Sequence, residues 1–180
     1  MRSERLERKF PKLLTAGYDI TSPQDHAYNC IAWAAHDVHR PWWPAGYGFW
    51  PRWIEPEETI DCFIRAFQLL GYKVCEDSHR EFGYQKVALY ALRNDPKHMA
   101  RQLSDGSWTS KLGQSEDITH FTLDAVEAYG PEPWYGEYGA PVVFMKRLVA
   151  ISWLIRFIQF IDWKLLASSK YALLISKFED

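Results

Sequence analysis

The two residues best suited to do chemistry are a cysteine and a histidine, Cys30 and His98. Asn29 is a suitable N-cap, and the residues after it, Cys30 to Ala35, are small or apolar and read as a helix. A cysteine in the first helical turn faces unpaired backbone N–H groups and the positive end of the dipole, and both favour the nucleophilic thiolate. His98 begins a strand-like segment far downstream, and a helix-start cysteine with a distant histidine is one way to build a thiol nucleophile. The opposing interpretation is a buried structural thiol, because free cysteine is among the most buried residue types.

Composition narrows the classes of partner. The chain has 180 residues, 47% of them hydrophobic, with a formal net charge of −2. This balance gives no bulk attraction to nucleic acid or to an anionic membrane, so we expect no nucleic-acid partner. The remaining cysteines, Cys62 and Cys75, have no close spacing to Cys30 or to each other, and both are interpreted as core. That pattern argues against a disulfide scaffold and a zinc site, and we expect no metal and no cofactor. The segment Met1–Lys12 is charged and lacks the apolar core of a signal peptide, so a cytoplasmic location is expected.

Periodicity predicts helices first and strands afterwards. A helix is expected from Cys30 to near Val38, followed by a long loop from Arg40 to Trp53 that is rich in Trp, Pro and Gly. A second helix is expected to open within 56–59 and to stop at Gly71, and the chain then reads as strands at 72–75, 86–92, 98–103, 108–110 and 142–148. The pair Asp105-Gly106 predicts a hairpin turn. The order predicts an α+β fold with N-terminal helices packed on an antiparallel sheet.

The C-terminal segment has a different character. We expect a single domain over 1–147, with its core at about 18–147, and an apolar or amphipathic helical tail over 148–180. A narrow polar stripe in the tail leaves a broad apolar face; it contains Ser152, Arg156 and Gln159. Docking on the domain or on a partner, including self-association, is the preferred interpretation. Binding to a membrane surface ranks second and a membrane span third, because charges interrupt the segment.

Several short sequence motifs occur along the chain in a specific order. They are Tyr28-Asn29-Cys30-Ile31-Ala32-Trp33-Ala34, the Trp-Pro loop, Lys86-Val87-Ala88-Leu89-Tyr90-Ala91 and the run from His98 to Gly113. This combination resembles a family of uncharacterised bacterial proteins, a domain of unknown function, over roughly Tyr18 to Arg147. The resemblance implies an architecture more than an activity.

At a looser level the layout resembles the papain-like superfamily, which includes peptidases, amidases and transglutaminases. That resemblance implies a cysteine at a helix start, a histidine at a strand start and a third residue on the next strand that orients the imidazole. The chain departs from the pattern at the third residue, because no acidic residue stands on the expected return strand. Ser110, Asp117 and His120 are the available alternatives.

Two functions follow from these observations. The first is a papain-like thiol hydrolase or acyltransferase acting on an amide or ester, with Cys30 as nucleophile and His98 as base. The second is an inactive member of the same fold that binds a protein partner, as an immunity or partner module. Substrate contacts are assigned to aromatic and amide side chains near Cys30; these are Asn29, Trp33, Trp42, Trp43 and Trp50. The preferred interpretation of the tryptophan loop as a whole is a hydrophobic lid over the sheet edge or over the Cys30 helix.

Overall fold

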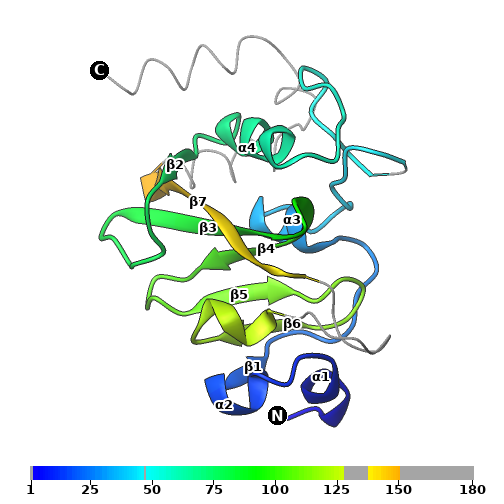
Figure 1. Cartoon of the computed structure of the whole chain (residues 1–180), viewed down its shortest axis with the longest axis vertical. Coiled ribbons are helices and arrows are strands. Elements are labelled where there is room, and N and C mark those ends of the chain that lie inside the picture. Colours follow the sequence, from blue (N-terminus) through cyan, green and yellow to red (C-terminus); the bar gives the residue numbers. More distant parts are fainter. Residues whose placement is uncertain (1, 47, 128–137, 151–180) are drawn as a thin grey trace.

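A computed structural model describes residues 2–46, 48–127 and 138–150. Within these residues the chain forms a seven-stranded sheet in the order β1-β6-β5-β4-β3-β7-β2, and the pairings are all antiparallel (Figure 1). The strands are β1 (Tyr18–Ile20), β2 (Lys73–Cys75), β3 (Tyr84–Leu92), β4 (Asp95–Gln102), β5 (Trp108–Lys111), β6 (Asp117–His120) and β7 (Ala140–Leu148). The predicted α+β class is confirmed; the predicted helical tail lies outside the described residues.

The described helices are short. They are α1 (Glu4–Lys9), α2 (Leu13–Ala16), α3 (Cys30–Ala34), α4 (Ile60–Gln68) and the 3-10 helix η1 (Leu123–Val126). α3 is shorter than the helix predicted to reach Val38, because His36 adopts a positive φ of 65° just beyond its C-cap. α4 begins as predicted, with the Thr59 side chain accepting a hydrogen bond from the Cys62 N–H.

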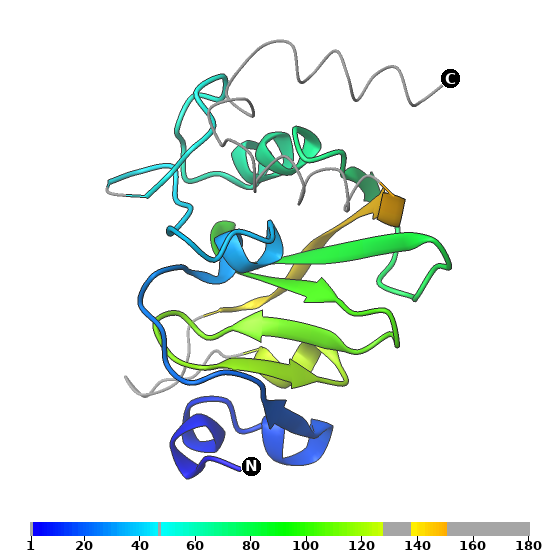
Figure 2. The same ribbon diagram turned by 180° about the vertical axis from the view of Figure 1, so that it is seen from behind.

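The sheet has a buried cluster on each face. Val87, Leu89 and Met99 pack with residues of α3 and α4 on one face. Ala88, Tyr90 and Ala100 pack with residues of η1 and the N-terminal helices on the other. α3 lies in front of the strands when the molecule is seen from behind (Figure 2). This alternation assigns each strand residue to the α3 face or to the η1 face.

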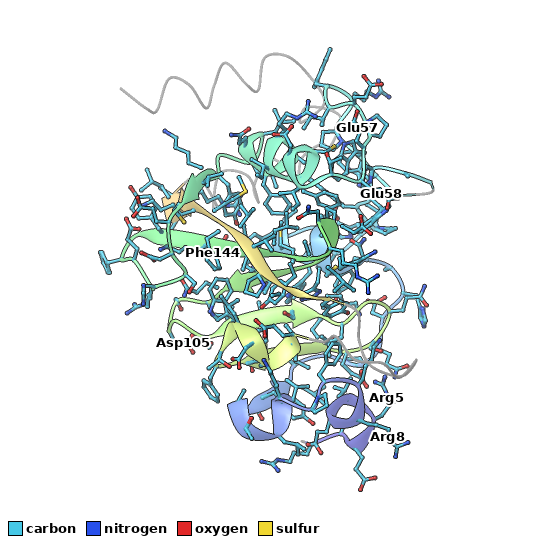
Figure 3. The ribbon with its side chains drawn as sticks, in the orientation of Figure 1. Arg5, Arg8, Glu57, Glu58, Asp105 and Phe144 are labelled. Carbon is cyan, nitrogen blue, oxygen red and sulfur yellow. The ribbon has the colours of Figure 1, made fainter. Side chains whose placement is uncertain are left out.

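The β4–β5 hairpin turns at Asp105-Gly106 as predicted, and Gly106 has a φ of 97°. Figure 3 labels Asp105 at this turn and Phe144 on β7. The ladder between β4 and β5 has two residue pairs, Arg101–Thr109 and Gln102–Trp108. Beyond these pairs, the β4 edge at residues 97–99 has no β5 partner within the described sheet. This opening in the ladder lies beside the start of α3.

Candidate active site

Cys30 begins α3 because Asn29 caps the helix. The Asn29 Oδ1 accepts hydrogen bonds from the N–H groups of Ala32 and Trp42, each at 3.0 Å. The Asn29 Nδ2 donates to the Trp42 carbonyl oxygen at 2.8 Å. The predicted cap is therefore confirmed, and the same side chain fastens the tryptophan loop to the start of α3.

The Cys30 sulfur lies against the free edge of β4. Sγ is 4.0 Å from the Lys97 carbonyl oxygen, and the Met99 N–H also points to it. The backbone N–H and C=O groups of a strand point outward in the plane of the sheet. The sulfur contacts such groups at residues 97 and 99, so it occupies the opening between β4 and β5. The residue between these two contacts is His98.

Burial changes the pKa of the Cys30 thiol more than the position at the helix start does. Desolvation raises the pKa of Cys30 to about 11, while hydrogen bonds from the backbone N–H groups of Met99, Ile31 and Cys30 itself lower it by less. The expectation that the helix start makes Cys30 a thiolate is therefore wrong for this conformation, because only 5% of the residue is exposed. The sulfur carries its proton here.

The His98 ring approaches the opening from the η1 face. It lies edge-on to Tyr90, with ring centroids 5.3 Å apart, and stacks on Tyr138 at 4.1 Å with 6° between the planes. His98 is fully buried. Desolvation, and secondarily His120, hold the pKa of its ring well below the ordinary value. The thiol and the imidazole are thus both uncharged. The sulfur contacts the β4 backbone on either side of residue 98, whereas the ring packs against Tyr90 and Tyr138 on the η1 face.

A hydrogen-bonded relay extends from His98. Its Nε2 is 3.0 Å from the Ser110 Oγ, which is 2.9 Å from the Nε2 of His120. The Nδ1 of His120 is 2.8 Å from the Thr122 carbonyl oxygen. Two of the three predicted orienting residues, Ser110 and His120, are therefore brought together beside His98.

The direction of each hydrogen bond follows from the one fixed acceptor. A carbonyl oxygen only accepts, so the proton of neutral His120 sits on Nδ1 and its Nε2 is an acceptor. The Ser110 hydroxyl donates to that nitrogen, which leaves its oxygen to accept the N–H of His98 Nε2. The lone pair of His98 is consequently on Nδ1. That atom is buried and has no hydrogen-bond partner among the described residues.

Asp117 does not join this relay. Its side chain accepts a 2.6 Å hydrogen bond from the Tyr28 hydroxyl and lies 3.7 Å from the Lys111 Nζ, on the α3 face. Lys111 is fully buried and its Nζ stands 4.8 Å from the centre of the Tyr28 ring. These contacts do not bring Asp117, the third predicted orienting residue, beside His98. It is half of a buried ion pair behind the residues that lead into α3.

Arg101 and Lys111 are both buried, although each carries a cationic side chain. Arg101 is buried, and its guanidinium lies 4.8 Å from the centre of the Trp33 ring. Trp33 in turn stacks near Tyr28, with ring centroids 5.8 Å apart. The cations of β4 and β5 therefore hold two aromatic residues of the α3 region against the sheet.

The tryptophans predicted as substrate contacts lie on the α3 face, away from the His98 ring. Trp33 donates from Nε1 to the Thr109 Oγ1 at 3.1 Å, and Trp42 donates to the Asp37 Oδ2 at 2.8 Å. Trp43 and Trp50 both meet Phe63 of α4 edge-on, at 5.3 and 5.2 Å. Trp42 is 1% exposed and cannot line a groove in this conformation. The loop instead covers the α3–α4 cluster, which agrees with the lid interpretation.

Tyr138 is a residue of the site that was not predicted from the sequence. It has no place in a helical or strand pattern before β7, and its partner His98 is 40 positions away in the chain. The combination Tyr138-Gly139 directly before a strand was the available signal. Gly139 has a φ of 69°, and a Cβ there would meet the Ala91 carbonyl oxygen at 2.0 Å, so only glycine brings the chain this close to β3.

The described residues contain no group of three or more His, Cys, Asp or Glu side chains that could hold a metal ion. No helix among them is long and apolar enough to cross a membrane.

Comparison with known proteins assigns a family but no activity. No curated protein and no solved structure matches the chain. A family model described as "Domain of unknown function (DUF7689)" matches residues 19–146. That segment begins in β1, ends in β7, and contains the cysteine, the relay and Tyr138. It covers most of the chain, and the protein therefore belongs to the DUF7689 family.

Proposed function

We propose that the protein is a thiol hydrolase or acyltransferase that acts on an amide or ester through Cys30 and His98. One observation carries the proposal. The relay leaves the lone pair of His98 on Nδ1, buried and without a partner among the described residues, and His98 is the residue between the two backbone contacts of the Cys30 sulfur. A buried polar atom without a partner is costly, and such atoms in native structures call for an explanation.

The proposed reaction proceeds in two steps through a thioester on Cys30. His98 Nδ1 takes the thiol proton as the sulfur attacks the carbonyl carbon, and the C=O electrons move to oxygen. The collapsing intermediate expels the amine or alcohol, which takes the proton from His98 and leaves a thioester on Cys30. Water, or an acceptor amine or alcohol in a transferase, then gives its proton to Nδ1 and releases the acyl group. The proton returns to the sulfur.

Ser110 and His120 act as positioning residues in this scheme. When Nδ1 takes a proton, His98 becomes a cation whose Nε2–H already donates to the Ser110 oxygen. His120 and the Thr122 carbonyl oxygen keep that oxygen oriented as an acceptor. The relay takes the place of the carboxylate that the papain-like resemblance implies, and it supplies orientation without a full negative charge.

The test uses p-nitrophenyl acetate with the full-length protein. We expect a burst of nitrophenol and an acetyl group on Cys30, located by mass spectrometry. Cys30→Ala should abolish the burst, and His98→Gln should slow acetylation by about 100-fold or more, the usual contribution of a general base. Cys75→Ala is the matched control and should behave as wild type, because Cys75 is half-buried on the edge strand β2. Acetylation of Cys30 at equal rates with and without His98 would exclude the pair.

A second function is favoured by a different observation. The pKa of Cys30 is raised, that of His98 is lowered, and no hydrogen bond joins the two side chains among the described residues. These features suit an inactive member of the fold that binds a protein partner. If no acetylation of Cys30 occurs and Cys30→Ala is as stable as wild type, this alternative replaces the first.

A further inference from the structure

Both reacting groups are covered in this conformation. Cys30 is 5% exposed and His98 is fully buried, so no acyl substrate can reach the sulfur or Nδ1 as they stand. Three described side chains close around the His98 ring; they are Tyr90, Ser110 and Tyr138.

Two of these three are fixed by the fold. Tyr90 is fully buried within β3, and its hydroxyl donates to the Leu123 carbonyl oxygen at 2.7 Å. Ser110 is fully buried in β5 and bonded on both sides in the relay. Moving either residue would break the sheet or the relay.

Tyr138 is held differently. It is half-buried, it precedes the first residue of β7, and its hydroxyl makes no hydrogen bond to the described residues. Its ring contacts with described residues are with His98, at 4.1 Å between centroids, and with Phe10, at 5.1 Å. Burial, and then the charge that Cys30 would carry as a thiolate, raise the pKa of its hydroxyl.

We propose that Tyr138 is the closing residue of the Cys30–His98 site: its ring covers the imidazole in the closed state and leaves the stack when substrate enters. Gly139 anchors the backbone beside this side chain. Its positive φ and its contact with the β3 backbone fix the chain immediately after Tyr138, so that rotation of one side chain uncovers the ring while β7 stays in place. This inference rests on the proposed function and names the group that controls access to it.

The closed position of the Tyr138 ring also affects proton transfer between Cys30 and His98. With the ring in place, proton transfer from Cys30 to His98 would create two charges in a dry site, which is unfavourable. Removal of the ring admits water or substrate, and both charged forms become easier to reach. Closure by Tyr138 therefore keeps the thiol protected and unreactive until something displaces the tyrosine.

The test measures access and needs no turnover. The rate of alkylation by iodoacetamide is followed by mass spectrometry at Cys30, with Cys75 as the internal reference. Tyr138→Ala should raise the Cys30 rate several-fold, up to about tenfold, since an aromatic stack contributes up to about that factor to a closing equilibrium. Tyr138→Phe keeps the ring and should match wild type. The pKa of His98, followed by NMR, should rise in Tyr138→Ala and not in Tyr138→Phe.

A second measurement covers the case in which Tyr138→Ala fails to fold. In the wild-type protein, Cys30 alkylation is measured at urea concentrations below the unfolding transition. Opening by one side chain exposes little surface, so the rate should hardly depend on urea. A rate that follows global unfolding, or a folded Tyr138→Ala that alkylates like wild type, would overturn the proposal. Failure of ester turnover alone would count against the proposed function and not against the closing role.

Discussion

His120 should make the stability of this protein sensitive to mild acid. The residue is 1% exposed, its Nδ1 donates to the Thr122 carbonyl oxygen and its Nε2 accepts from Ser110. Desolvation lowers the pKa of His120 from 6.5 to about 4, although Thr122 and Asp124 act in the opposite direction. The folded state therefore resists a proton that the unfolded chain accepts readily.

The difference between the folded and unfolded pKa of His120 gives the direction and the size of the change in stability with pH. Above pH 6.5 the residue is neutral in both states and contributes no pH dependence. As the pH falls below 6.5, the unfolded chain binds the proton and the folded protein does not, so stability is lost until the pH reaches the folded pKa. At pH 5 the loss from this one residue is about 2 kcal/mol, and it approaches about 3 kcal/mol near pH 4. His98 is shifted in the same direction and adds to the loss.

The assay is urea unfolding followed by tryptophan fluorescence at pH 7.0, 6.0, 5.0 and 4.5. His120→Asn removes the titrating group, so its free energy of unfolding should fall less steeply between pH 7 and pH 5, by about 2 kcal/mol relative to wild type. Carboxylates titrate equally in both proteins and cancel in the comparison. His26→Asn is the matched control at an exposed histidine, and it should not reproduce the change seen in His120→Asn. Parallel curves for wild type and His120→Asn would refute the reasoning.

Three further outcomes are expected. Ser110→Ala leaves two buried imidazole nitrogens without their shared partner, so it should cost about 1–3 kcal/mol in urea unfolding and change the tautomer seen by ¹⁵N NMR. Gly139→Ala places a Cβ against the Ala91 carbonyl oxygen at a positive φ, and it should lower stability by more than about 2 kcal/mol; an unchanged melting temperature would contradict the close contact. Asp117→Asn leaves the buried Lys111 ammonium without its anion and should cost about 3–5 kcal/mol, whereas removing the exposed Asp61 carboxylate from its pair with an arginine of α4 should cost under about 0.5 kcal/mol.

The local features of the fold were predictable because their causes are local. Asn29 caps α3 through a bond to the N–H three residues later, and Thr59 does the same for α4. Asp105-Gly106 makes its turn with a glycine at positive φ. Each of these depends on residues within four positions of one another, and residue type alone specifies the geometry.

The site was predictable only in part, because the register of paired strands depends on segments that are distant in the sequence. Ser110 and His120 share a face with His98 only once β4, β5 and β6 are aligned, and the sequence left Asp117 as an equal alternative. The alternation within β6 separates them. His120 faces the relay, and Asp117 faces Lys111 on the opposite side. A shift of one residue in the register of β6 would have exchanged the two roles.

The expectation from sequence and the structure differ on whether Cys30 is a thiolate. A helix start favours a thiolate by up to about 1 kcal/mol where the charge is solvated, and α3 has only five residues. The rise in the pKa of Cys30 from 9.0 to about 11 corresponds to about 3 kcal/mol against the thiolate. Desolvation is thus the larger effect, and sequence position alone could not reveal it. Any nucleophilic role for Cys30 consequently depends on solvent or substrate entering the opening between β4 and β5. Of the three side chains that close the opening around His98, Tyr138 is the one that neither the sheet nor the relay holds in place.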